Sequence, residues 1–276
     1  MAQDLNRKLV VDGLLKVEKS GFSNLVLPSL LSDSRLTVQD KGFISNLFYG
    51  TIERKITLDY ILGRFISKPL KKLDREVLAI MESGLYQILY MNSVPSFAAI
   101  NQAVSLCSSF KKTSAKGLVN AVLRKAAEYD INTAKFSSEK EKMTVLYSIS
   151  GEIVDIVIKD YPDNYEDILK GMLITPSLTI NINTTKISVN DFTQILEEKG
   201  IEYKTTPLPN CLEITHGGAV TALPGFEEGY FFVQGLTSRY AISMAGIKQG
   251  DNVLDLCAAP VAKLLRRLFI LTTQVQ

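Results

Sequence analysis

The spacing of apolar residues changes at Pro176, and this change is the strongest constraint on the fold. Before Pro176, apolar residues recur three and four positions apart, as they do on one face of a helix. After it, Leu178, Ile180 and Ile182 alternate with polar residues, which predicts a strand. The sequence therefore predicts an all-helical first part, followed by a part in which strands and helices alternate.

The first 130 residues predict a compact bundle of helices joined by short connectors. Gly21 and Pro69 end two of the helical segments, and Pro95 separates two others. Thr37 and Asp40 have the spacing of a capping box at a helix start. Residues 131–170 continue in a helical but more acidic pattern, and we interpret them as a helical linker.

Residues 171–232 predict a small α/β module. Its first strand lies at 178–182, and a helix starts after Ser188 and ends at Gly200. Further strands are expected at 201–205, 212–215 and 229–234. Residues 233–276 begin another domain, with a helix near 236–246 and an apolar strand at 252–256. His216 stands beside two glycines and is expected in a turn.

Charge is unevenly distributed along the chain, although the net charge is only +2. Residues 1–130 carry 18 Lys and Arg against 12 Asp and Glu, whereas residues 131–230 carry 8 against 15. Residues 231–276 are basic again, with 5 against 2. This division fits segments with different functions, but random variation of the surface would produce it too.

The composition excludes several classes of protein. With 46% hydrophobic and 22% charged residues, the chain is neither disordered nor collagen-like. No apolar run reaches the length of about 18 residues that spans a bilayer. The three cysteines, Cys107, Cys211 and Cys257, are far apart and form no C-x-x-C pair, which fits a reducing cytoplasm and argues against a zinc site. A single histidine excludes a His-based metal centre or catalytic cluster.

The segment from Val253 to Pro260 has the form of a cofactor loop. An apolar strand ends in Asp255 and is followed by the small residues Ala258 and Ala259. Nucleotide-type cofactors bind at such places, because the backbone after the strand must come close to the ligand. Taken alone, the pattern also fits an ordinary buried strand.

The full string, Asp255-Leu-Cys-Ala-Ala-Pro260, resembles the S-adenosylmethionine motif of RNA cytosine-C5 methyltransferases. Val233, Gln234 and Ser238 extend the likeness to the Sun/Fmu type, which modifies bacterial small-subunit ribosomal RNA. Four earlier segments are similar to helices of the NusB-like domain in that family: 49–54, 73–78, 99–104 and 116–124. Residues 175–183 resemble the first strand of its small module, so the resemblance runs from residue 5 to residue 260.

The resemblance implies a NusB-like helical RNA-binding domain at 1–130 and the start of a Rossmann-type methyltransferase domain at 233–276. It implies transfer of a methyl group from S-adenosylmethionine to C5 of a cytosine in small-subunit ribosomal RNA. The implied cofactor residues are Cys257, Ala258, Ala259, Pro260 and Lys263. Cys257 also fits the simpler interpretation of a small buried residue beside a strand.

Two departures from the family pattern count against activity. Val261 and Ala262 stand where the family has two glycines, and their Cβ atoms restrict a backbone that must approach the cofactor. Only 16 residues follow Pro260, in a sequence unlike the family's that resembles a shifted reading frame. The family's two catalytic cysteines have no counterpart, so we assign no catalytic residue and expect a truncated, inactive methyltransferase domain.

Basic residues around the last two bundle helices are the candidate RNA contacts: Lys111, Lys112, Lys116, Arg124 and Lys125. Their side chains could neutralise phosphates, although a solvated helix face would look the same. Arg7 and Lys8 are a second candidate. These residues keep a rival function open, a non-enzymatic RNA-binding module of the NusB antitermination type, acting alone or with a protein partner.

Overall fold

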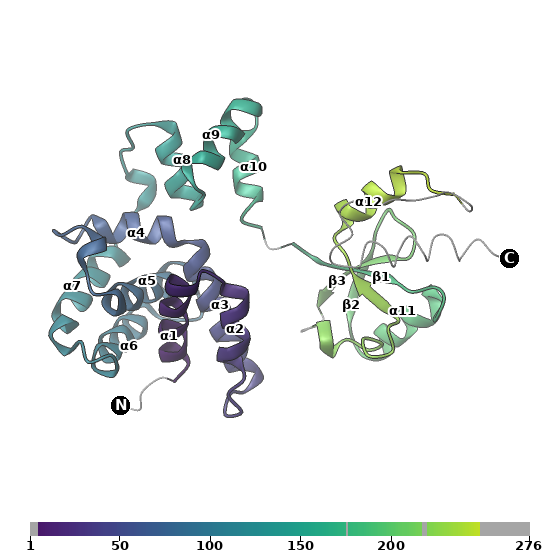
Figure 1. The fold of residues 1–276 in the computed structure, drawn as a ribbon, viewed down its shortest axis with the longest axis horizontal. Helices are drawn as coiled ribbons and strands as arrows, with labels where there is room; N and C mark the ends of the chain where they lie inside the picture. The colour runs from purple at the N-terminus through teal and green to yellow at the C-terminus, as the bar shows by residue number, and fades with distance from the viewer. Residues whose placement is uncertain (1–4, 175, 217–219, 249–276) are drawn as a thin grey trace. The chain divides into compact units, whose positions relative to one another are not determined.

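The computed structural model describes residues 5–174, 176–216 and 220–248, which belong to two units (Figure 1). The first unit ends at Ile174 and is entirely helical, whereas the second contains a sheet. Each unit has its own hydrophobic core. The predicted order, a helical part followed by a small module that contains strands, is confirmed.

Seven α-helices form the bundle of the first unit within the described residues. They are α1 (Leu5–Ser20), α2 (Ser23–Leu31), α3 (Val38–Glu53), α4 (Lys55–Gly63), α5 (Arg75–Tyr90), α6 (Ser96–Ser109) and α7 (Lys116–Ala127). Helix α5 lies at the centre, because it packs against α1, α3, α4, α6 and α7. Residues 79–87 of α5 are buried without a break, as expected for a helix surrounded by others.

A glycine lets α3 approach α5 closely. A Cβ atom at Gly50 would overlap the ring and hydroxyl of Tyr86. The Tyr86 hydroxyl donates a hydrogen bond to Oδ1 of Asn46 at 3.0 Å, which fixes the ring against α3. The Tyr49-Gly50 step of the sequence pattern therefore has a packing reason.

The predicted capping box at the start of α3 is confirmed. The Asp40 backbone amide donates to Thr37 Oγ1 at 3.2 Å, and Asp40 Oδ2 accepts from the Thr37 backbone amide at 3.0 Å. Asn6 of α1 donates a further hydrogen bond to Asp40. The capping box thus supplies hydrogen-bond partners to backbone amides at the start of α3, and Asp40 also links α3 to α1.

Three further helices follow the bundle: α8 (Glu139–Tyr147), α9 (Gly151–Asp160) and α10 (Tyr165–Gly171). They enclose a small core of their own around Met143, Val154 and Leu169. Helix α8 packs against α4 of the bundle through two hydrogen bonds. Thr57 Oγ1 donates to the Val145 carbonyl at 2.6 Å, and the Ile56 amide donates to Ser148 Oγ at 3.1 Å.

The second unit is a four-stranded antiparallel sheet in the order β2-β3-β1-β4. Its strands are β1 (Leu178–Ile182), β2 (Glu202–Thr205), β3 (Cys211–His216) and β4 (Phe231–Val233), and its helices are α11 (Val189–Glu198) and α12 (Leu236–Met244). Phe192 and Leu196 of α11 pack on Ile180 and other apolar residues of one sheet face. The predicted helix start is confirmed, because the Asp191 amide donates to Ser188 Oγ at 3.1 Å.

The structure adds one detail to the sequence-based expectations for this unit and corrects another. The polar residues Thr179 and Asn181 of β1 are 7% and 2% exposed, so both faces of β1 are covered. His216 is the last residue of β3 and not a turn residue. The expected strand at 252–256 lies outside the described residues.

No helix in the described ranges is long and apolar enough to cross a membrane. Across the same ranges, His, Cys, Asp and Glu form no group of three that could hold a metal ion.

Candidate functional site

The basic residues of the predicted RNA site lie on the hairpin of α6 and α7, but they do not form one cluster. Lys111 and Lys112 lie in the connector, where Lys111 has a left-handed backbone with φ of +57°. Lys116 and Lys125 lie in α7, nine residues and therefore about 13 Å apart along its axis. At about 100° per residue they point to opposite sides of the helix.

Three residues of α7 share one side of the helix at a spacing of four: Lys116, Asn120 and Arg124, here called the α7 stripe. Arg124 Nε donates to Asn120 Oδ1 at 3.3 Å, which orients the exposed guanidinium. Lys116 is half-buried beside α6. Burial raises the pKa of the Cys107 thiol on α6, and the nearby Lys116 ammonium opposes this shift.

Lys112 is engaged within the protein. Its Nζ lies 3.0 Å from Asp74 Oδ2 and 3.5 Å from Glu76 Oε2, at the start of α5. The hydrogen bond to Asp74 raises the pKa of Lys112. The ammonium charge is therefore balanced by two carboxylates, and this residue is a weaker candidate for a phosphate contact than the α7 stripe.

The second basic candidate, near the start of α1, is likewise engaged. Arg7 Nε donates to Gln87 Oε1 at 2.6 Å, and its guanidinium lies 4.9 Å from the centre of the Phe43 ring. Lys8 forms an ion pair with Asp12 at 3.6 Å. Arg7 thus joins α1 to α3 and α5.

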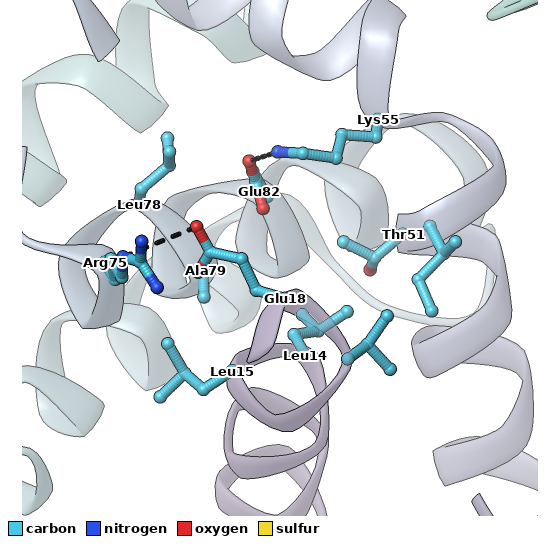
Figure 2. Close-up of a pocket in the computed structure, with 11 residues that line it drawn as sticks. Leu14, Leu15, Glu18, Thr51, Lys55, Arg75, Leu78, Ala79 and Glu82 are labelled. Atoms are coloured by element: carbon cyan, nitrogen blue, oxygen red, sulfur yellow. Dashed lines mark hydrogen bonds and ion pairs between the residues drawn. The ribbon is translucent and has the colours of Figure 1, made fainter. Parts of the chain in front are cut away.

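A pocket of about 140 Å³ lies between α1, α3 and α5, and sequence reasoning did not find it (Figure 2). Most of its lining is apolar, from Leu14, Leu15, Ile52, Leu78 and Ala79. Figure 2 shows ion pairs at two places on its edge, one between Arg75 and Glu18 and the other between Lys55 and Glu82. The pocket is large enough for one small apolar group.

Two acids share one cation beside this pocket. Lys55 forms ion pairs with Glu82 and with Asp59, the latter at 3.1 Å. Burial raises the pKa of Glu82 to about 8, Lys55 opposes the shift and Asp59 adds to it. A charged residue within the apolar run of α5 was the one signal of this arrangement in the sequence.

The predicted cofactor residues Cys257, Ala258, Ala259, Pro260 and Lys263 lie outside the described residues. Their arrangement therefore stays a prediction from the sequence.

Comparison with known proteins assigns both units. The NusB family model matches residues 4–128, and the model of the RsmF/B-like methyltransferase ferredoxin-like domain matches residues 153–221. The chain therefore contains a NusB domain followed by an RsmF/B-like ferredoxin-like domain. The resemblance predicted from the motifs is confirmed.

The relatives of this chain share one described function. The probable ribosomal RNA small subunit methyltransferase B of Coxiella burnetii is 30% identical over 246 residues, which are 86% of this chain and 54% of that protein. Ribosomal RNA small subunit methyltransferase B of Escherichia coli O1:K1 is 27% identical over 93% of this chain and 59% of its own length. The Proteus mirabilis protein of the same name is 28% identical over 93% and 60%. The chain thus spans somewhat more than half the length of these relatives.

One solved structure, that of a protein called PH0851, has the same fold. Its TM-score is 0.70 at 19% identity, over 97% of this chain and 61% of that one.

Proposed function

We propose that this chain is part of an S-adenosylmethionine-dependent methyltransferase that forms 5-methylcytosine in small-subunit ribosomal RNA. The observation that supports it is the order of the two domains, NusB and then RsmF/B-like ferredoxin-like, together with the function for which the relatives are named. The chain spans only part of the length of those relatives, so its substrate and its activity are both part of the proposal. It also includes a cytoplasmic location, where ribosomal RNA is modified.

In this proposal the helical unit binds the RNA. Lys116 and Arg124 of the α7 stripe would contact phosphates, with Asn120 holding the guanidinium. Lys111 and Lys125 would add charge from neighbouring positions. No residue is proposed to read a base.

S-adenosylmethionine would supply the methyl group, held by the loop from Cys257 to Pro260 with Lys263. Glycine lets a loop backbone approach its ligand, whereas a β-branched residue resists left-handed angles. We therefore propose that Val261 and Ala262 weaken cofactor binding in this chain.

A second candidate is a non-enzymatic RNA-binding module that acts alone or with a protein partner. The match of residues 4–128 to the NusB family favours it, because that part of the chain is a helical bundle with its own hydrophobic core.

Titration with S-adenosylmethionine in a calorimeter, combined with methyl incorporation into unmodified small-subunit RNA, separates the two candidates. Heat of S-adenosylmethionine binding together with methyl incorporation into the RNA supports the methyltransferase. RNA binding with neither signal supports the module. The double variant Val261→Gly with Ala262→Gly should bind the cofactor more tightly than the parent chain. Equal affinity of the two would contradict the role given to these residues.

A further inference from the structure

The sheet face opposite α11 contains a buried side chain that makes no hydrogen bond to the described residues. Asn181 is 2% exposed, and within the described part of the chain neither its Oδ1 nor its Nδ2 has a hydrogen-bond partner. Buried polar atoms are almost always hydrogen-bonded in folded proteins, because leaving one unpaired costs free energy. Asn181 therefore points to a group that the described residues do not supply.

Arg239 on α12 is also a buried polar side chain that is incompletely hydrogen-bonded within the described residues, and it carries a charge. It is 8% exposed, and its Nη2 donates to the Pro209 carbonyl at 3.1 Å. Its Nε has no partner, and no carboxylate of residues 5–174, 176–216 or 220–248 lies within ion-pair distance of it. A buried guanidinium without an anion is strongly unfavourable.

Asn181 and Arg239 both lie near Cys211. Asn181 and Cys211 are directly opposite in the β1–β3 ladder, so their side chains lie on the same face of the sheet. Arg239 hydrogen-bonds the carbonyl two residues before Cys211. Burial lowers the pKa of Arg239, and the nearby Cys211 opposes this shift. Cys211 is itself 2% exposed.

We propose that Asn181 and Arg239 form a binding site for a phosphate group. The free Nε–H of Arg239 and the Nδ2 amide of Asn181 both donate, and the guanidinium supplies the opposite charge. A phosphate has several oxygens and can accept from both groups at once. The site lies in the second unit, whereas the α7 stripe belongs to the first. Phosphate binding at this site does not depend on methyltransferase activity.

Inorganic phosphate is the first probe, added to the full chain with potassium chloride of equal ionic strength as the reference. Phosphate should raise the melting temperature, because a ligand that binds only the folded state stabilises it. Arg239→Gln should weaken phosphate binding, measured by calorimetry, by about tenfold or more. Arg35→Gln, which removes an exposed guanidinium paired with Asp33, is the matched control and should leave it unchanged.

Asn181→Asp is the sharper variant, because it changes the charge at nearly constant shape. Its carboxylate would pair with Arg239 inside the protein, so the melting temperature without phosphate should rise and the response to phosphate should disappear. This variant also decides the matter if Arg239→Gln does not fold. A phosphate response that Asn181→Asp or folded Arg239→Gln retains in full would overturn the proposal, as would no response in the parent chain.

A single-stranded RNA oligonucleotide identifies the source of the phosphate. If Arg239→Gln weakens both RNA and inorganic phosphate binding, the site takes a phosphodiester of the RNA backbone. If it weakens inorganic phosphate binding alone, the site takes free phosphate. If Arg239→Gln weakens neither RNA binding nor inorganic phosphate binding, the proposed site is contradicted.

Discussion

At the scale of single residues, the contact between Gly50 and Tyr86 should be intolerant of one added methyl group. Gly50→Ala places a Cβ atom where the Tyr86 ring lies, and overpacking of this kind costs about 1–3 kcal/mol. Gly42→Ala in the same helix has open space around it, so it should stabilise the protein by about 0.5–1 kcal/mol. Urea unfolding of both variants measures the difference. Equal stabilities would show that α3 and α5 are not in close contact.

Glu82 should make the stability of the helical unit depend on pH. Its pKa in the folded protein is about 8, above the ordinary value of 4.5, so the folded state holds a proton that the unfolded state releases. The contribution of Glu82 to stability is therefore complete below about pH 4.5 and is lost as the pH rises to about 8. Glu82→Gln cannot titrate, so its stability relative to the parent chain should increase over this range.

Chemical unfolding at pH 5, 6.5 and 8 measures this difference. Glu128→Gln, at an exposed position after α7, serves as the control and should follow the parent chain. A Glu82→Gln curve parallel to that of the parent would contradict the raised pKa.

At the scale of elements, the α7 stripe should be separable from the rest of the basic residues. Arg124→Ala should weaken RNA binding similarly for all sequences, and it should reduce the slope of log affinity against log salt by about one unit. Lys112→Ala should leave that slope unchanged, because its charge is balanced by Asp74 and Glu76. It should instead lower stability slightly, by up to about 1 kcal/mol. Filter binding over a series of salt concentrations measures the slope for both variants. A reduced slope for Lys112→Ala with an unchanged slope for Arg124→Ala would place the RNA on the connector between α6 and α7.

The sequence predicts these elements well wherever the determining interactions are local. Thr37 with Asp40 and Ser188 with Asp191 are three residues apart, and both helix starts are where they were expected. Contacts between distant residues could not be predicted. The ion pair of Lys55 with Glu82 joins residues 27 apart, and the burial of Asn181 depends on what covers the second face of the sheet.

At the scale of the whole molecule, the two units should unfold as separate transitions. Thr37→Ala removes the N-cap of α3 in the first unit, and Ser188→Ala removes the N-cap of α11 in the second unit. Each substitution should lower the free energy of unfolding of its unit by about 1 kcal/mol. In differential scanning calorimetry, each variant should move one transition and leave the other in place. A shift of both transitions by either variant would mean that the units are thermodynamically coupled.

The two hydrogen bonds between α4 and α8 limit where the chain can be divided by gene engineering or by recombination in evolution. The first amides of a helix need acceptors, and Ile56 at the start of α4 finds one in Ser148. A gene segment cut at the end of the NusB match, residue 128, would leave that amide and the Thr57 hydroxyl without these acceptors. The smallest portable piece of this protein should therefore be longer than the family domain it contains, and should extend to residue 171.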